Sequence, residues 1–176
     1  MSTLVRRVRP DEWREVRGLR IEALRDPVAA IAFLGTAAGA ERQPDEFWQT
    51  RTRDAASGDA AAQFVARSAD GRWLGTATVL RRAAGEVDPL GRTLDAARSD
   101  VVGVYVQPDA RGTGVIADLF EACADWARGL GDSALTLDVH VDNARARRAY
   151  ERCGFVETGV TMTGSIGPEL EMRRSL

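Results

Sequence analysis

One stretch of the sequence, residues 101–116, joins an apolar strand to a glycine-rich helix start. Residues 101–106 read Val-Val-Gly-Val-Tyr-Val, which predicts a strand buried on both faces, and Pro108 then turns the chain. Gly112 and Gly114 precede an amphipathic helix. The first N–H groups of a helix lack intrahelical acceptors and carry partial positive charge, and glycine lets a ligand approach them closely. The stretch therefore predicts a cradle for pyrophosphate, either of a dinucleotide or of coenzyme A.

Length and charge limit what else the chain can be. Its 176 residues predict a single domain over 1–176, too short for a cofactor domain plus a substrate domain. The 24 basic residues stand against 26 acidic ones, so no cationic field favours nucleic acid or an anionic membrane as a partner. All 24 are arginine, which excludes a Schiff-base lysine and the lysine of a P-loop.

Targeting signals and metal-ligand patterns are both missing from the sequence. No run approaches the roughly 20 apolar residues that span a bilayer, and residues 1–7 lack the apolar core of a signal peptide, so we expect a cytoplasmic protein. Cys123 and Cys153 have no CxxC spacing, and His140 is the only histidine. We therefore expect free thiols and no metal site.

Periodicity predicts an α/β (α+β) fold with the order β-α-α-β-β-β-α-β-α-β-β. Residues 28–42 are rich in alanine and glycine and show no clear period, and residues 83–99 read as a polar loop. The expected strands span 4–9, 63–68, 73–82, 101–107, 134–141, 155–162 and 169–174, and the expected helices span 11–25, 45–56, 115–130 and 143–153.

A dinucleotide site is the first alternative for the cradle. Gly112-x-Gly114-x-x-Ala117 matches the G-x-G-x-x-G/A fingerprint, and Asp138 follows at a distance suited to a ribose hydroxyl. However, five residues separate Val106 from the first glycine, where a dinucleotide fold turns almost directly from strand to glycine. The strands before the motif also predict an antiparallel meander rather than βα units, which disfavours a doubly wound sheet.

Two motifs together resemble the GCN5-related N-acetyltransferase (GNAT) family. Arg111-x-x-Gly114 before an amphipathic helix is similar to the acyl-CoA signature Q/R-x-x-G-x-G/A of that family. The segment 143–155 is similar to its N-x-x-A-x-x-x-Y-x-x-x-G-F element. The resemblance covers residues 100–156 in detail and departs at Ile116, where the family carries glycine or alanine.

The resemblance implies a mixed central sheet of six to seven strands with a splayed parallel pair, flanked by about four helices. It implies acetyl-CoA as the acyl donor, with the pantetheine arm along the first strand of the pair and the pyrophosphate on the helix start. A glycine inside this strand, Gly103, is typical of a bulge that could direct an N–H at the thioester oxygen, or of a close approach by a neighbouring side chain. The implied donor-binding residues are Val104, Tyr105, Val106, Arg111, Gly112, Thr113, Gly114, Val115, Ile116, Asn143 and Tyr150.

The resemblance also implies the catalytic groups. Tyr150 matches the tyrosine that lies beside the thioester sulfur, and a phenol can protonate a departing thiolate at neutral pH. Asp100 stands where many relatives carry a glutamate that takes the amine proton. Glu86, Asp88 and His140 are the rivals for this base, and Asn143 both caps its helix and faces the pantetheine in the family.

The expected acceptor is an amine-bearing small molecule or peptide, and the protein is expected to be a monomer or homodimer. The acids within 83–99 favour a cationic amine, although no motif identifies it. The arginines at 145, 148 and 152 share a helical face that either meets the 3′-phosphate of CoA or is solvated. Two alternatives to an acetyltransferase remain, a non-catalytic acyl-CoA-binding relative and a nucleotide-cofactor enzyme.

Overall fold

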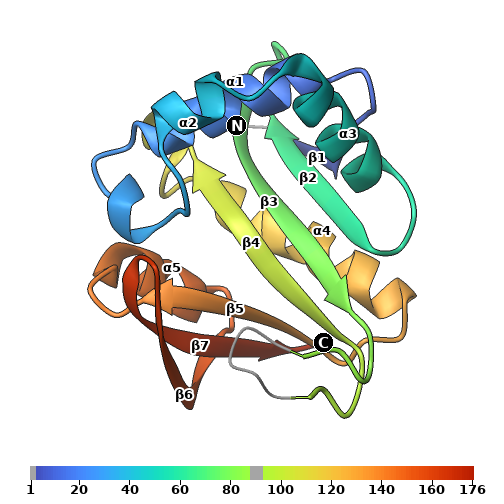
Figure 1. Ribbon diagram of the computed structural model, residues 1–176, viewed down its shortest axis with the longest axis vertical. Helices are drawn as coiled ribbons and strands as arrows, with labels where there is room; N and C mark the ends of the chain where they lie inside the picture. Colours follow the sequence, from blue (N-terminus) through green and yellow to red (C-terminus); the bar gives the residue numbers. More distant parts are fainter. Residues whose placement is uncertain (1–2, 88–92) are drawn as a thin grey trace.

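The computed structural model describes residues 3–87 and 93–176 and contains a single seven-stranded mixed sheet. The strands lie in the spatial order β1-β2-β3-β4-β5-β7-β6 (Figure 1). All neighbouring strands are antiparallel except β4 and β5, which run parallel. The strands are β1 (Leu4–Arg7), β2 (Ala61–Arg67), β3 (Trp73–Arg82), β4 (Arg98–Val106), β5 (Ala134–His140), β6 (Val156–Gly164) and β7 (Gly167–Ser175).

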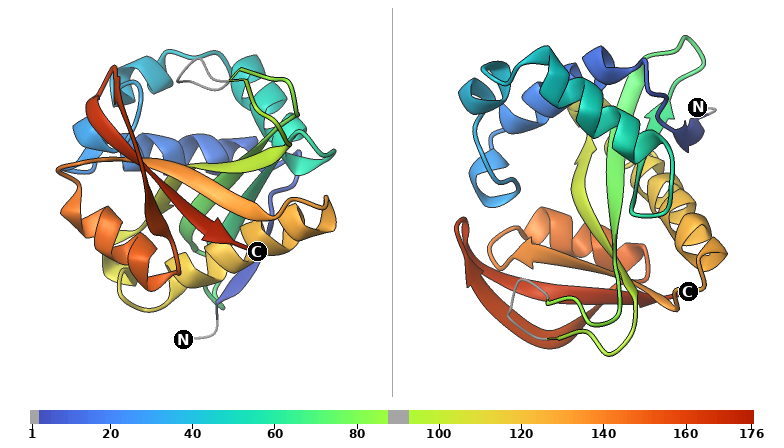
Figure 2. Two further views of the ribbon diagram at one scale, coloured as in Figure 1. Left: turned by 90° about the horizontal axis from the view of Figure 1, so that it is seen from below. Right: turned by 45° about the vertical axis from the view of Figure 1, so that its right-hand side comes forward.

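Helices cover both faces of the sheet (Figures 1 and 2). Three of them, with a short 3₁₀ turn, lie on one face of β1–β4, and two lie on the other. The first group is α1 (Trp13–Leu24), η1 (Ala29–Ile31), α2 (Ala37–Glu41) and α3 (Asp45–Ala56), and the second is α4 (Val115–Gly129) and α5 (Ala144–Arg152), with η2 (Pro108–Ala110) before α4. No helix in the described ranges is long and apolar enough to cross a membrane.

The largest core lies between α4 and the sheet. Apolar residues repeat along α4 at helical spacing, so one face of the helix is buried while the other faces solvent. Leu119 and Phe120 are fully buried there against β-strand residues such as Leu135. Smaller clusters under α1 and α3 bury Trp13 and Trp48. The two layers hold the sheet rigid on both sides of β4.

The parallel pair is joined over a very short length. β4 pairs with β5 only at Ser99 with Leu135 and at Asp100 with Thr136. Beyond these residues the two strands separate toward their carboxyl ends, as Figure 1 shows. β5 continues along β7 over its whole length, whereas the corresponding edge of β4 pairs with no strand of the described residues. The splay predicted from the family resemblance is confirmed.

A bulge interrupts β4 at Gly103. Thr78 of β3 pairs with Val102, but Thr76 pairs with Tyr105, so β4 carries one extra residue between these positions. Gly103 has a φ of +62°, a conformation that residues with a Cβ rarely adopt. A Cβ on Gly103 would meet no atom within 4 Å, so backbone conformation, and not a bulky neighbour, requires glycine here.

Most element predictions are confirmed, with differences at the ends of the elements. The segment 28–42 contains η1 and the short helix α2, whose start Thr36 caps by accepting from the Gly39 N–H. β4 begins at Arg98, so the last residues of the predicted polar loop 83–99 belong to the strand. The closing hairpin turns more tightly than predicted, with Gly164 paired to Gly167.

Candidate active site

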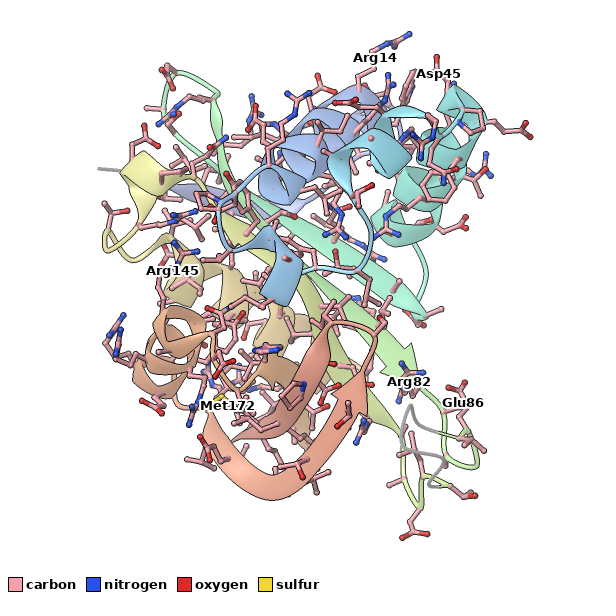
Figure 3. All side chains as sticks on the ribbon, turned by 60° about the vertical axis from the view of Figure 1, so that its left-hand side comes forward. Arg14, Asp45, Arg82, Glu86, Arg145 and Met172 are labelled. Carbon is pink, nitrogen blue, oxygen red and sulfur yellow. The ribbon has the colours of Figure 1, made fainter. Side chains whose placement is uncertain are left out.

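A cleft of about 410 Å³ opens where β4 and β5 separate. Its walls come from β4, the glycine-rich turn, β5, α5, the segment after α1 and the β6–β7 hairpin. In Figure 3 the arginine at 145 marks one side of the molecule, and Arg82 and Glu86 lie together on the opposite side. The cleft thus brings the segment after α1 together with residues from the second half of the chain.

The glycine-rich turn has the geometry of a pyrophosphate cradle. Gly112 and Gly114 have φ values of +77° and +96°, and a Cβ on either would meet no atom within 4 Å. Space in front of the turn is therefore open. The first hydrogen bonds of α4 run from the N–H groups of Ala117 and Asp118 to the carbonyl of Gly114. The preceding N–H groups stay free for an anion, which fits the phosphates of coenzyme A.

The side chain of Arg111, the first residue of the acyl-CoA signature, bonds to other groups of the protein. Its Nε donates to the carbonyl oxygen of Val106 at 3.0 Å, and its guanidinium forms an ion pair with Asp26. The Asp26 side chain is only 2% exposed, accepts from the Val28 N–H and also lies 3.6 Å from the guanidinium of Arg145. Arg111 thus ties the segment after α1 to the start of the cradle, and its side chain is already occupied.

The other predicted donor-binding residues divide into two groups. Thr113 and Val115 do not line the cleft: the Thr113 hydroxyl donates to the Ala110 carbonyl at 2.7 Å, and Val115 is 1% exposed in the core. Their backbone N–H groups still belong to the cradle. The predicted residues that line the cleft are Val104, Tyr105, Val106, Arg111, Gly112, Gly114, Ile116, Asn143 and Tyr150.

Ile116 occupies the position where the family carries a small residue. Its side chain is half-buried, packs against the core under α4 and also lines the cleft. Turning partly into the core keeps the bulky side chain compatible with a free backbone at the helix start. The side chain therefore narrows the cleft beside the glycine-rich turn but leaves the pyrophosphate cradle open.

Asn143 caps α5, as predicted. Its Oδ1 accepts from the N–H of Ala146 at 3.2 Å, and its own N–H donates to the carbonyl of His140. The side chain is buried and lines the cleft. Within the described ranges its Nδ2 bonds no protein group, so the amide can donate to a ligand.

Tyr150 of α5 lines the cleft and packs beside a pair of phenylalanines that contact each other. Its ring lies 5.6 Å from Phe120 and 6.3 Å from Phe155, centroid to centroid. Burial raises the pKa of Tyr150 to about 12, so its hydroxyl is protonated at neutral pH. Across the described residues, no protein group hydrogen-bonds to this hydroxyl. The phenol is thus a free proton donor inside the cleft.

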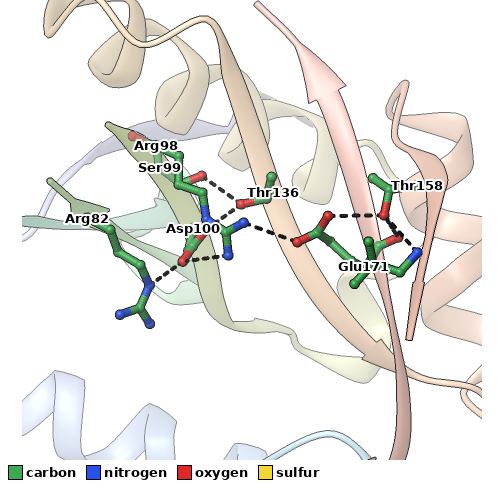
Figure 4. A network of polar contacts seen from close by, with 8 residues as sticks. Arg82, Arg98, Ser99, Asp100, Thr136, Thr158 and Glu171 are labelled. Carbon is green, nitrogen blue, oxygen red and sulfur yellow. Dashed lines mark hydrogen bonds and ion pairs between the residues drawn. The ribbon is translucent and has the colours of Figure 1, made fainter. Parts of the chain in front are cut away.

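Asp100, the base expected from the resemblance, lies in a network of polar contacts (Figure 4). Its carboxylate pairs with Arg82 at 2.5 Å and with Arg98 at 2.9 Å, and it accepts from the hydroxyl of Thr136. Asp100 is 7% exposed and is not among the cleft-lining residues of the described chain. These contacts tie the carboxylate to the short β4–β5 junction and do not place it in the cleft with the other expected site residues.

The other candidates for the general base are His140, Glu86 and Asp88. The Nδ1 of His140 accepts from the N–H of Asp142 at 3.1 Å, which puts the ring proton of the neutral imidazole on Nε2 and leaves no free basic nitrogen. Glu86 is exposed and does not line the cleft, although it belongs to the described residues. Asp88 lies outside the described residues.

Asp138 is the acid that the sequence analysis did not consider as a base. It lies on β5, lines the cleft and is paired in register with Glu171 of β7, while His140 is paired with Glu169. Asp138 is the one exposed residue of β5, and its exposed surface lies in the cleft. Burial, reinforced by the nearby carboxylates of Glu171, Glu169 and Asp100, raises its pKa to about 6. Burial also raises the pKa of Glu169, which lines the same cleft.

Alternation along β5 was the available signal for Asp138. Thr136, Asp138 and His140 share one face of the strand, and the sequence shows this directly. The acids opposite them belong to β7, more than 30 residues later, and their register with β5 is a property of the folded sheet.

The two cysteines are free thiols, as expected. Cys123 is buried in the core, and burial raises its pKa. Cys153 is half-buried and lines the cleft, and burial raises its pKa as well. Among residues 3–87 and 93–176 no group of three or more His, Cys, Asp or Glu side chains could hold a metal ion.

Comparison with known proteins agrees with this geometry. A family model described as the Acetyltransferase (GNAT) family matches residues 22–155. Aminoglycoside N(6′)-acetyltransferase type 1 of Stenotrophomonas maltophilia is 32% identical over 132 residues, which cover 75% of this chain and 83% of that protein.

Solved structures show the same fold at low sequence identity. A GCN5-related N-acetyltransferase from Kribbella flavida has a TM-score of 0.71 at 22% identity, covering 99% of this chain and 98% of that chain. A phosphinothricin acetyltransferase from Sinorhizobium meliloti, solved in complex with AcCoA, has a TM-score of 0.72 at 16% identity, covering 100% and 89%. The splayed strands, the glycine cradle and these matches show that the chain belongs to the GNAT family of N-acetyltransferases, whose acyl donor is acetyl-CoA.

Proposed function

We propose that the protein transfers an acetyl group from acetyl-CoA directly to a primary amine of a small cationic molecule, with Asp138 as the base and Tyr150 as the acid. The observation that carries the proposal is that one cleft contains both a carboxylate whose pKa is raised to about 6 and a phenol without a protein partner. Two titratable groups whose environments suit opposite proton transfers are typical of an acid–base pair.

The base acts on the acceptor. An amine is protonated at neutral pH and cannot attack until it loses a proton. A carboxylate with a pKa of about 6 is ionised at neutral pH, and it is a stronger base than an ordinary aspartate. Asp138 therefore takes the ammonium proton first, and the neutral amine nitrogen then attacks the thioester carbonyl.

The acid acts on the leaving group. As the new C–N bond forms and the C–S bond breaks, the sulfur gains negative charge and needs a proton. The hydroxyl of Tyr150 supplies it, and the free Nδ2 of Asn143 is a further donor in the same cleft. Phe120 and Phe155 fix the tyrosine ring, which limits the positions its hydroxyl can take.

Direct transfer is favoured over an acetylated enzyme intermediate. The cysteine in the cleft, Cys153, has a pKa raised by burial, so it is a thiol rather than a nucleophilic thiolate. The only histidine already accepts a hydrogen bond at Nδ1 and cannot activate it. The acceptor and acetyl-CoA must therefore be bound together when the amine attacks.

A cationic acceptor suits the charge of the cleft. Asp138 and Glu169 line its β5–β7 side, whereas the arginines that line it, Arg111, Arg145 and Arg152, come from the cradle and α5. An acceptor cation is therefore expected on the β5–β7 side. The relative from Stenotrophomonas maltophilia is named for aminoglycosides, which are polycationic amines, and this class heads the panel to be tested.

The test is release of free CoA thiol with acetyl-CoA and a panel of amines containing aminoglycosides, polyamines, amino acids and short peptides. We expect turnover with at least one cationic primary amine, and initial-rate patterns that intersect because a ternary complex forms. Parallel patterns would contradict direct transfer. Tight acetyl-CoA binding with no thiol release on any amine would instead identify a non-catalytic acyl-CoA-binding relative, and preferential binding of NAD would identify a nucleotide-cofactor protein.

A further inference from the structure

A second, smaller pocket of about 20 Å³ lies between α1, α3 and the sheet. Two residues of β4, Gly103 and Tyr105, line both this pocket and the main cleft. The pocket therefore adjoins the cleft at the β4 bulge. Its volume suits a group about the size of a water molecule or the end of a carboxylate.

Two arginines line this pocket, and no acidic residue does. Arg20 of α1 donates to the Leu34 carbonyl at 3.1 Å and lies 4.7 Å from the centre of the Phe33 ring. Arg51 of α3 has no hydrogen bond or ion pair within the described ranges. Half-buried Arg20 and exposed Arg51 thus line one pocket to which no carboxylate of the described residues contributes.

The electrostatics of the pair are consistent with a missing anion. Burial lowers the pKa of Arg20 to about 10, and the nearby charge of Arg51 lowers it further in the same direction. Burial also lowers the pKa of Arg51. Like charges that line one small pocket repel each other, and an anion placed between them would relieve the repulsion.

The sheet beneath the arginines adds neutral donors. Thr78 is 8% exposed, and its hydroxyl bonds no protein group in the described part of the chain. Gln63, also 8% exposed, gives one N–H of its amide to the hydroxyl of Thr76 at 3.0 Å and keeps the other. Thr76 in turn donates to the Phe64 carbonyl, which fixes the orientation of this short chain.

We propose that this pocket binds a carboxylate or similar oxyanion, held by Arg20 and Arg51 with Thr78 and Gln63 beneath it. Guanidiniums bind carboxylates by charge-assisted hydrogen bonds, which are stronger than neutral ones. The anion has two possible sources. It is either the carboxylate of an amine acceptor, whose amine then lies in the cleft beside the β4 bulge, or a free anion that binds independently of the acceptor.

The first experiment tests the pocket without catalysis. Thermal unfolding is followed with sodium acetate or inorganic phosphate against sodium chloride at constant ionic strength. A free anion predicts a rise in Tm that saturates for the wild type and is absent in Arg51→Gln. Arg53→Gln, two residues along the same exposed helix and outside the pocket, is the matched control and should keep the rise.

The second experiment tests the acceptor as the source and rests on the proposed function. KM is compared between amino acids and their amides, which differ by one negative charge at nearly the same shape. We expect a KM lower by about tenfold for the acid, lost in Arg51→Gln and in the isosteric Thr78→Val, and kept in Arg53→Gln. If no amine is acetylated, the proposed function fails while the thermal experiment still decides on the pocket. Equal KM values together with no anion-dependent Tm would overturn the proposal.

Discussion

At the scale of single residues, the protonation states in the cleft follow from what surrounds each group. Tyr150 is enclosed by aromatic rings and retains its proton, whereas Asp138 faces other carboxylates and holds its proton more strongly than a surface aspartate does. Asp100 is the contrasting case, because two arginines and a threonine occupy its carboxylate. The two aspartates thus lie in different surroundings, although the sequence places both on strands.

Replacing Tyr150 by phenylalanine should lower kcat on the order of 10²-fold, because the thiolate then leaves without a positioned proton donor. The ring contacts with Phe120 and Phe155 remain, so the Kd for acetyl-CoA and the Tm should stay close to wild type. Steady-state kinetics and acetyl-CoA titration measure the two quantities. An unchanged kcat would remove Tyr150 from the mechanism.

Replacing Asp138 by asparagine should lower kcat on the order of 10²-fold and change the pH profile. In the wild type, kcat/KM should fall as the pH drops through about 6, where Asp138 takes up a proton. The residual activity of the variant should lack this limb. Asp142→Asn, an 80% exposed aspartate just after β5, serves as the control and should retain it.

The same variant makes a prediction about stability. The pKa of Asp138 is raised in the folded protein. Between the ordinary aspartate pKa and about pH 6, the folded protein therefore holds a proton that the unfolded chain has lost. The stability contributed by the protonated form is lost as pH rises through that window. Asp138→Asn should therefore raise Tm more at about pH 7.5 than at about pH 4.5. Equal increases in Tm at both pH values would show that the surroundings do not disfavour the ionised form of Asp138.

At the scale of elements, the start of α4 depends on backbone conformation. Gly114 has a φ of +96°, and an alanine there would strain the turn by about 1–2 kcal/mol and displace the cradle N–H groups. Gly114→Ala should lower Tm and raise KM for acetyl-CoA. Gly129→Ala, at the other end of the same helix and without a positive φ, should leave KM unchanged and stabilise by up to about 1 kcal/mol.

Sequence patterns correctly predicted the long helices and strands, whose apolar residues repeat regularly. They also predicted the motifs whose residues are contiguous in the chain. α4, β3 and the cap at Asn143 belong to this class, because each depends on residues close together in the chain. α2 was missed because its five residues are too short to show a period.

The contacts of the candidate bases could not be predicted from the sequence, for a different reason. The environment of Asp100 depends on the β3–β4 register, which brings Arg82 opposite Arg98, and that of Asp138 depends on the β5–β7 register. Neither register can be read from the sequence.

At the scale of the whole molecule, Asp26 connects the two sides of the cleft. It belongs to the segment after α1, and it pairs with Arg111 before α4 and with Arg145 on α5. A buried carboxylate with two arginines holds these three segments in one arrangement.

Asp26→Asn removes the charge that Arg111 and Arg145 share, and should destabilise the fold by about 2–3 kcal/mol. It should also raise KM for acetyl-CoA more than it lowers kcat, since the cradle shifts while Tyr150 and Asp138 remain. Asp125→Asn, which breaks an exposed pair with Arg128, should change neither Tm nor KM measurably. A wild-type KM in Asp26→Asn would show that the cradle is independent of this connection.

The short junction between β4 and β5 also bears on how the empty protein behaves in solution. Past Asp100 and Thr136, no strand in the described part of the chain pairs with the β4 edge, and unpaired edges promote association between chains. A pantetheine arm lying there would act as the missing strand of the sheet. Bound coenzyme A would then stabilise this edge of the sheet. Saturation with coenzyme A should slow amide hydrogen exchange along residues 102–106 and suppress aggregation on heating. Neither effect requires transfer of an acetyl group.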